Sequence, residues 1–209
     1  MDFKIEIAHP NDAARLTDIY FAAFTNELSR RIMPHTDDVR DFQIAGFKKD
    51  AEQSRSASSK RHLVKIVGKA PDKTPVITGF ARWRLFEGDA DEGVKSGVQW
   101  PASSDAALCN SFFTKVDAER RRAVGDQQHY YLELLAVDPA FGRRGLGARL
   151  LKWGLNRADE ARVITFISSS PSGRGLYEKH GCRALNNYQV IPGYRETSMI
   201  RPVGGMSRG

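Results

Sequence analysis

Apolar and polar residues alternate along several short stretches of the chain, a period that is typical of β-strands. In residues 3–8, Phe3, Ile5 and Ile7 alternate with polar or small residues. Similar or continuously apolar stretches of strand length follow at 62–67, 76–86, 130–137, 163–168, 183–190 and 197–200. Glycine, proline and aspartate end several of them, as expected for turns.

Apolar residues spaced three or four apart predict helices between these strands. The predicted helices cover 13–25, 38–55, one or two helices in 105–124, 146–161 and 175–180. The segments 25–37 and 87–101 are rich in turn-forming residues and are predicted to be irregular. Strands on both sides of the helix 146–161 indicate an α/β (α+β) fold, with a mixed sheet and helices on both faces.

Composition is that of an ordinary globular protein, with 209 residues, 41% hydrophobic and 27% charged. We expect one domain, 1–203, and a flexible tail, 204–209. No apolar run is long enough to span a bilayer, and the first residues lack the apolar core of a signal peptide. Cys109 and Cys182 suggest neither a disulfide framework nor a metal site. A cytoplasmic protein without a membrane partner is therefore expected.

The net charge of +7 and the pI near 9.5 favour an anionic partner. Nucleic acid, acidic lipid and a phosphorylated cofactor all satisfy that condition. The basic residues are scattered, and no zinc-finger or RNP-type motif is present, so we expect no nucleic-acid partner.

A glycine-rich turn, Phe141–Gly147, joins the apolar strand 130–137 to the helix that begins near residue 146. The first turn of a helix has unpaired N–H groups and the positive end of the helix dipole, and glycines let the backbone approach a phosphate. Arg143 and Arg144 add positive charge. The turn lacks the Lys-Ser/Thr pair of a Walker A loop, and Gly145-Leu146-Gly147 lacks the third glycine of a Rossmann fingerprint.

The sequence Val137-Asp138-Pro139, followed by Gly142–Gly147, resembles the coenzyme A loop of the GNAT superfamily of N-acetyltransferases. The family motif is Gln/Arg-x-x-Gly-x-Gly/Ala; Gly145 and Gly147 match it, and Gly142 replaces its first residue. Leu176–Gly181 looks like the family's LYEKxGF signature, with Cys182 at the position of the phenylalanine. The preceding Ser170-Pro171-Ser172-Gly173 resembles a variant found in many fungal members, and Ser170 stands where commoner members have asparagine.

The resemblance implies a GNAT fold, with a mostly antiparallel sheet of about six or seven strands that splay at the cofactor site, and a longer insertion at 87–128. It also implies acetyl-CoA as the cofactor. The residues that it implies for cofactor binding are Leu135, Ala136, Val137, Gly142, Arg143, Arg144, Gly145, Leu146, Gly147, Ala148, Ser170, Gly173 and Tyr177.

Tyr177 is implied to be the general acid that protonates the coenzyme A thiolate; its alternative is a core tyrosine. Glu133, a carboxylate in an apolar strand, is the candidate base and acceptor-binding residue. The alternatives for Glu133 are an outward side chain or a pair with an arginine. Trp83 is predicted to wall the acceptor pocket, with a core position as its alternative.

The predicted function is transfer of an acetyl group from acetyl-CoA to a primary amine of a small molecule or peptide, by direct attack in a ternary complex. The alternative is a catalytically idle or regulatory module that binds coenzyme A, because Gly142 and Ser170 depart from the common family motifs. A monomer or a homodimer is expected.

Overall fold

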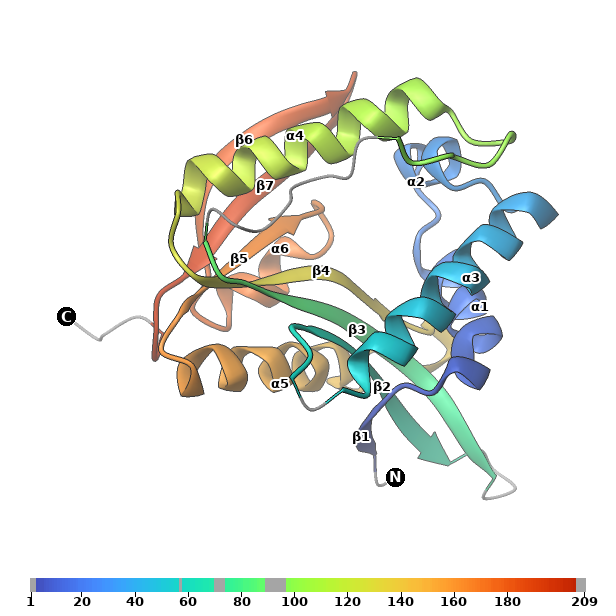
Figure 1. The fold of residues 1–209 in the computed structure, drawn as a ribbon, viewed down its shortest axis with the longest axis horizontal. Coiled ribbons are helices and arrows are strands. Elements are labelled where there is room, and N and C mark those ends of the chain that lie inside the picture. Colours follow the sequence, from blue (N-terminus) through green and yellow to red (C-terminus); the bar gives the residue numbers. More distant parts are fainter. Residues whose placement is uncertain (1–2, 57, 70–73, 89–96, 206–209) are drawn as a thin grey trace.

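The computed structural model describes residues 3–56, 58–69, 74–88 and 97–205. Seven strands form one sheet in the order β1-β2-β3-β4-β5-β7-β6 (Figure 1). Only β4 and β5 pair in parallel among these neighbours in the described chain, so the prediction of a mixed, mostly antiparallel sheet is confirmed. The strands are β1 (Lys4–Ile7), β2 (Arg61–Lys69), β3 (Pro75–Phe86), β4 (His129–Val137), β5 (Ile164–Ser169), β6 (Arg183–Ile191) and β7 (Tyr194–Arg201).

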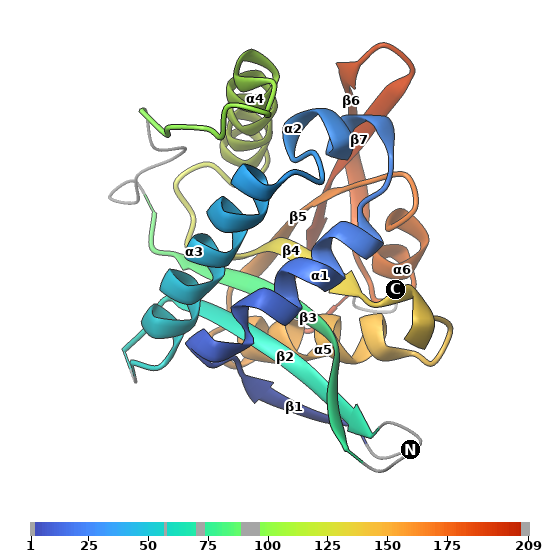
Figure 2. The same cartoon turned by 90° about the vertical axis from the view of Figure 1, so that its right-hand side faces the viewer.

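Helices cover both faces of the sheet (Figures 1 and 2). One face carries α1 and α3 over β2 and β3, and α5 packs against β2 to β5 from the opposite face. The helices are α1 (Ala13–Ala23), α2 (Glu27–Ile32), α3 (Asp37–Ser54), α4 (Ala106–Val124), α5 (Leu146–Glu160) and α6 (Arg174–Glu178), with 3-10 turns at Pro10–Asp12 and Pro139–Phe141.

Sequence patterning missed one helix and left a second undecided. The segment 25–37, predicted to be irregular, contains α2, whose first turn is capped by the Asn26 side chain at 3.0 Å from the Ser29 N–H. Its apolar signal is confined to two buried residues, Leu28 and Ile32. The segment 105–124 forms a single helix, α4. Parts of the predicted loop 87–101 and of the predicted tail, residues 89–96 and 206–209, lie outside the described residues.

A β-bulge changes the face toward which β4 directs its side chains. Leu132 lies opposite Trp83 and Leu134 lies opposite Arg82, so Glu133 is the extra residue. Leu132 packs in the core beneath α5, whereas Leu134 packs against the core beneath α1 and α3. In a regular strand both would face the same side.

Helix α5 lies close to the sheet because Gly154 faces the indole ring of Trp83. A methyl group on Gly154 would lie 2.1 Å from the Trp83 Cε2 atom. Trp83 is fully buried in the core that α5 covers. The contact leaves no room for any larger residue at 154.

Replacing Gly154 with alanine is expected to lower the free energy of unfolding by about 1–3 kcal/mol, because α5 must move away from Trp83. The matched control is Gly46→Ala in α3, where no atom lies within 4 Å of the added methyl group. It should raise the free energy of unfolding by about 0.5–1 kcal/mol through helix propensity. Urea denaturation of both variants measures the two effects, and equal effects would contradict the packing argument.

Candidate functional site

The parallel strands β4 and β5 pair along only part of their length. The pairing runs from His129 opposite Ile164 to Leu132 opposite Ile167. Beyond it β4 continues to Val137 and β5 to Ser169, and the two strands diverge near the centre of the sheet (Figure 1). Backbone groups that face the gap need hydrogen-bond partners from elsewhere. The predicted splay of the strands is thus present.

The glycine turn leads from β4 to the N-terminus of α5. Asp138 accepts a hydrogen bond from the Ala140 N–H at 2.9 Å and starts the turn. Gly145 adopts a left-handed conformation, φ 72°, immediately before Leu146, the first residue of α5. Since Gly145 has no side chain to cap the helix, the amides of the first turn remain open to an anion.

The residues around this turn suit the pyrophosphate of coenzyme A. A methyl group at Gly147 would point toward Leu176 of α6 and Leu135 of β4, at 3.5 and 3.7 Å. The start of α5 therefore lies beside α6 and the splayed end of β4. Six of the predicted cofactor residues line one pocket: Leu135, Ala136, Val137, Ser170, Gly173 and Tyr177. The predicted residues of the turn, Gly142 to Ala148, are not among the described residues that line it.

Tyr177 lies in α6 and lines the same pocket, with only 9% of its surface exposed. Gly173 provides the space for its ring, because a methyl group there would lie 3.0 Å from the Tyr177 Cε2 atom. Burial raises the pKa of the Tyr177 hydroxyl, and the nearby carboxylate of Glu196 raises it further. The hydroxyl therefore keeps its proton at neutral pH.

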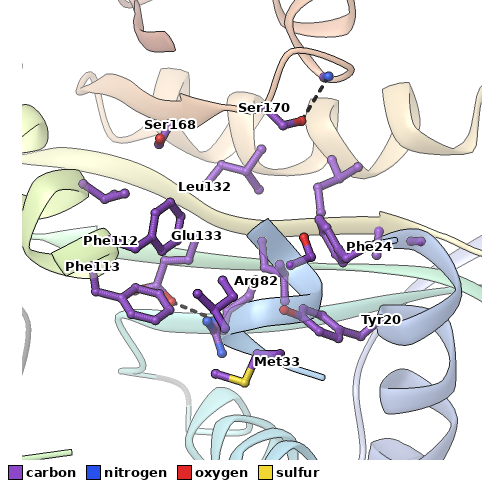
Figure 3. Close-up of a pocket in the computed structure, with 18 of the residues that line it drawn as sticks. Tyr20, Phe24, Met33, Arg82, Phe112, Phe113, Leu132, Glu133, Ser168 and Ser170 are labelled. Carbon is purple, nitrogen blue, oxygen red and sulfur yellow. Dashed lines mark hydrogen bonds and ion pairs between the residues drawn. The ribbon is translucent and has the colours of Figure 1, made fainter. Parts of the chain in front are cut away.

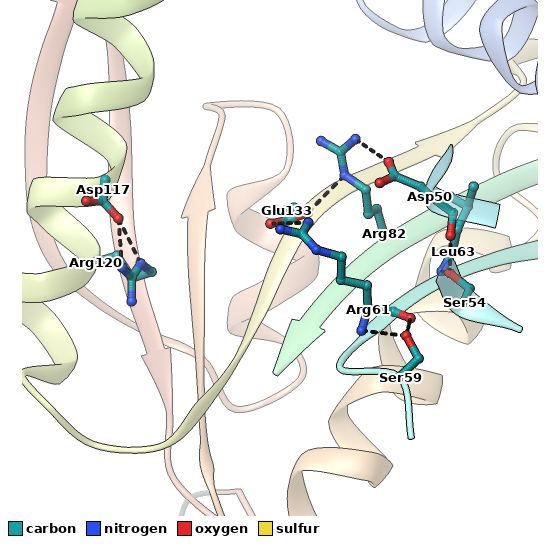
Figure 4. A network of polar contacts seen from close by, with 9 residues as sticks. All are labelled: Asp50, Ser54, Ser59, Arg61, Leu63, Arg82, Asp117, Arg120 and Glu133. Carbon is teal, nitrogen blue, oxygen red and sulfur yellow. Dashed lines mark hydrogen bonds and ion pairs between the residues drawn. The ribbon is translucent and has the colours of Figure 1, made fainter. Parts of the chain in front are cut away.

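Glu133 lines the pocket at the bulge, where two arginines surround it (Figure 4). The Nε atom of Arg82 lies 3.0 Å from a Glu133 carboxylate oxygen, and Arg61 lies 3.9 Å from the other. Arg82 also binds Asp50 at 2.9 Å. The structure thus contains the arginine pair that the sequence left open as an alternative, and the role of Glu133 as a base stays a prediction.

The prediction that Trp83 walls the acceptor pocket is wrong. Its indole ring is fully buried against Gly154 on the α5 face, and the described residues that line the pocket do not include it. The reason is strand alternation: the neighbouring Arg82 points to the pocket face, so Trp83 points away from it.

Sequence reasoning missed Glu196, a second carboxylate in the pocket. Glu196 lies in β7 with 7% of its surface exposed, and burial raises its pKa despite hydrogen bonds from Ser168 and Tyr194. The final strand was predicted to begin at residue 197, one position too late to include it. Its signal in the sequence is weak, because Glu196 stands next to Arg195 in a short stretch that otherwise contains tyrosine, threonine and serine.

The pocket has a volume of about 690 Å³ and extends from the splayed strands toward the N-terminal helices and α4 (Figure 3). The rings of Tyr20 in α1, of Phe24 directly after α1, and of Phe112 and Phe113 in α4 line it. Its size is typical of a small-molecule site. The end beside β4, β5 and α6 holds Leu135, Ala136, Val137, Ser170, Gly173 and Tyr177, and the aromatic end holds none of the predicted cofactor residues.

Comparison with known proteins identifies the C-terminal part of the chain. Residues 118–201 match the acetyltransferase (GNAT) domain family. The match covers less than half of the chain, and it shows that these residues are similar to that family. No curated protein is significantly similar to it in sequence.

Solved structures extend the GNAT fold over the whole chain. The C-terminal condensation domain of Ebony, in complex with beta-alanyl-dopamine, has a TM-score of 0.67 at 15% identity, over 97% of this chain and 100% of that one. Mosquito arylalkylamine N-acetyltransferase like 5b has a TM-score of 0.66 at 13% identity, with the same coverage. YncA from Salmonella typhimurium, solved with acetyl-CoA, has a TM-score of 0.55 at 15% identity, over 100% of this chain and 98% of that one.

The similarity to this family indicates an acyltransferase that uses acetyl-CoA, and the splayed strands and the start of α5 fit this cofactor.

The further resemblance of Ser170–Gly173 to fungal members stays a prediction. Among the described residues, none of the helices is both long and apolar enough to cross a membrane.

Replacement of Glu196 by glutamine should change how stability depends on pH. Because burial raises the pKa of Glu196, the folded chain binds its proton more tightly than the unfolded chain does. The free energy of unfolding therefore falls as the pH rises from 4.5, the ordinary pKa of a glutamate in an unfolded chain, through the raised pKa in the folded chain. Glu196→Gln lacks this loss, so its stability relative to the native chain should increase with pH.

Urea denaturation at a series of pH values measures that difference. Glu178→Gln, at a half-exposed carboxylate in α6, is the control for general pH effects. A difference between Glu196→Gln and the native chain that stays constant across the series would contradict the burial argument.

Proposed function

We propose that this chain transfers an acetyl group from acetyl-CoA to a primary amine of a small molecule or peptide, by direct attack in a ternary complex. One observation carries the proposal: a single pocket joins the splayed strands and Tyr177 to the aromatic walls formed by α1 and α4. Donor and acceptor can therefore meet in one cavity. The name of the mosquito structure, which states an amine acceptor, supports the choice of an amine.

Direct attack is favoured over a thiol-bound intermediate. Cys109 and Cys182 are buried, and neither is among the residues that line the pocket. Burial raises the pKa of both thiols to about 11, so they are protonated at neutral pH and weak as nucleophiles.

Each part of the site has a role in this proposal. Amides from Arg143 to Ala148 bind the pyrophosphate, and amides from Leu135 to Val137 orient the acyl carbonyl at the edge of β4. Tyr177 gives its proton to the leaving thiolate.

Because α1 and α4 supply the walls of the acceptor pocket and the glycine turn supplies the cofactor site, we also propose that residues 1–203 act as one domain.

The second candidate function is an idle or regulatory module that binds coenzyme A. Its specific support is that Glu133, the base predicted from the sequence, is held by Arg82, and that Gly142 and Ser170 depart from the family motifs. Such a module would bind acetyl-CoA without turning over any amine.

Calorimetric titration with acetyl-CoA tests the cofactor site. The native chain should bind it, and the double variant Gly145→Asp/Gly147→Asp should lose at least about tenfold in affinity, because its carboxylates repel the pyrophosphate. Gly145→Asn/Gly147→Asn has the same side-chain shape and backbone strain without the charge, and it should bind better than the aspartate variant. Thermal unfolding of both verifies their folding. Absence of binding by the native chain would refute the proposal.

Tyr177→Phe should lower kcat by about 10²-fold and leave the affinity for acetyl-CoA nearly unchanged, because it removes only the proton donor. Release of the coenzyme A thiol from acetyl-CoA in the presence of an amine measures kcat. An unchanged kcat would assign Tyr177 to the core alone.

A further inference from the structure

Glu196 lies where β4 and β5 part. Its neighbour Ser168 in β5 follows Ile167, the last residue that pairs with β4. The Ser168 hydroxyl donates a hydrogen bond to Glu196 and lies 2.5 Å from the Tyr188 hydroxyl. The Tyr194 hydroxyl lies 3.4 Å from the other Glu196 oxygen. The carboxylate is thus held in place by hydroxyl groups at the gap between the splayed strands.

The three carboxylates that line the pocket, Asp50, Glu133 and Glu196, differ in their charge balance, and Asp50 is paired with Arg82. Glu133 has Arg82 as a close ionic partner. Among the residues that the structure describes, no lysine or arginine forms an ion pair with Glu196. A buried carboxylate is costly unless a cation or several hydrogen bonds stabilise it. A ligand with an ammonium group would supply the missing cation.

The pocket that this carboxylate lines has apolar as well as charged walls. Besides the rings of Tyr20, Phe24, Phe112 and Phe113, the side chains of Phe42, Trp100 and Met33 line it, and so do the cations Lys49, Arg61 and Arg82. Aromatic rings stabilise both an apolar body and a nearby ammonium group. Such walls favour an amine whose remaining part is aromatic or aliphatic over one that carries further charges.

Resting on the acetyl transfer proposed above, we infer that Glu196 binds the acceptor as an ammonium ion and then removes its proton, and that the acceptor is a primary amine with an aromatic or other apolar body. The inference assigns Glu196, in place of Glu133, as the base. Its position at the gap places it on the same side of the splayed strands as Tyr177, which also lines the pocket.

The proton balance of this step is complete. Glu196 takes one proton from the ammonium, and the freed lone pair of nitrogen forms the C–N bond with the carbonyl carbon of the acetyl donor. The C–S bond breaks, and the thiolate takes the proton of Tyr177. The second proton lost by nitrogen restores Tyr177, and the proton on Glu196 leaves to solvent as the amide departs.

Four tyrosines lie close to Glu196, and the charged side chains of Lys49, Asp50, Arg61, Arg82 and Glu133 also line the pocket. Tyr131 of β4, Tyr177 of α6, Tyr188 of β6 and Tyr194 of β7 all have raised pKa values because of burial, so they stay neutral at acidic pH. From α4, Phe112, Phe113 and Val116 contribute only apolar surface. Glu133, across the pocket, is paired with Arg82.

Steady-state release of the coenzyme A thiol with three amines tests the acceptor class. The probes are 2-phenylethylamine, n-hexylamine and ethanolamine, at pH 8. We expect kcat/KM for the first two to exceed that for ethanolamine by at least about tenfold, since only they fill the apolar walls. A preference for ethanolamine, or binding of acetyl-CoA without turnover of any probe, would overturn the acceptor assignment.

Variants of Glu196 test whether this residue acts as the base. Glu196→Gln should lower kcat/KM for 2-phenylethylamine by about 10²-fold, and Glu196→Asp should recover part of it. Calorimetry should show unchanged binding of acetyl-CoA by both variants. The native profile of kcat/KM should fall toward acidic pH as Glu196 is protonated, and Glu196→Gln should lack this decrease, which a purely structural role would not produce.

The matched control is Glu133→Gln, at a carboxylate that lines the same pocket and is paired with Arg82. A loss of activity in Glu133→Gln with near-native activity in Glu196→Gln would assign the base to Glu133 and overturn the inference. A loss of activity in either variant is compatible with the proposal of acetyl transfer. By contrast, absence of acetyl-CoA binding by the native chain would remove the proposed function and this inference together.

Discussion

The early end of the pairing between β4 and β5 is the constraint on which the rest of the site depends. A sheet that loses hydrogen bonds near its centre leaves backbone groups without partners, and such groups are costly when they are also removed from water. The chain places them beside a pocket that a polar ligand can enter. The pocket there is lined by the diverging ends of both strands and by residues of α1, α3 and α4.

The bulge at Glu133 complements this opening. Before the bulge, Leu132 anchors β4 to the core beneath α5, and after it Leu134 joins the core beneath α1 and α3. One extra residue therefore lets the strand contribute to both cores while its edge diverges from β5. The ion pairs of Arg82 with Asp50 and Glu133 then connect α3, β3 and β4 on the pocket face.

Sequence patterning predicted the strands, most helices and the cofactor turn because these depend on local period and on glycine positions such as Gly145. It could not place Trp83 on the correct face with certainty, since an aromatic residue in a strand suits a core and a pocket wall equally well. It missed Glu196 because the importance of that residue comes from contacts with β5 and β6, which are distant in the sequence. The arginine partner of Glu133 was left open for the same reason.

The position of β7 in the sheet has a consequence for synthesis of the chain. This strand lies between β5 and β6 although it is made after both, and it carries Glu196 and Tyr194. The turn before α5 and the strands β1 to β4 can associate while β7 is still being translated, because domains begin to fold from their N-terminal side. The part of the pocket that Tyr194 and Glu196 line is therefore completed last.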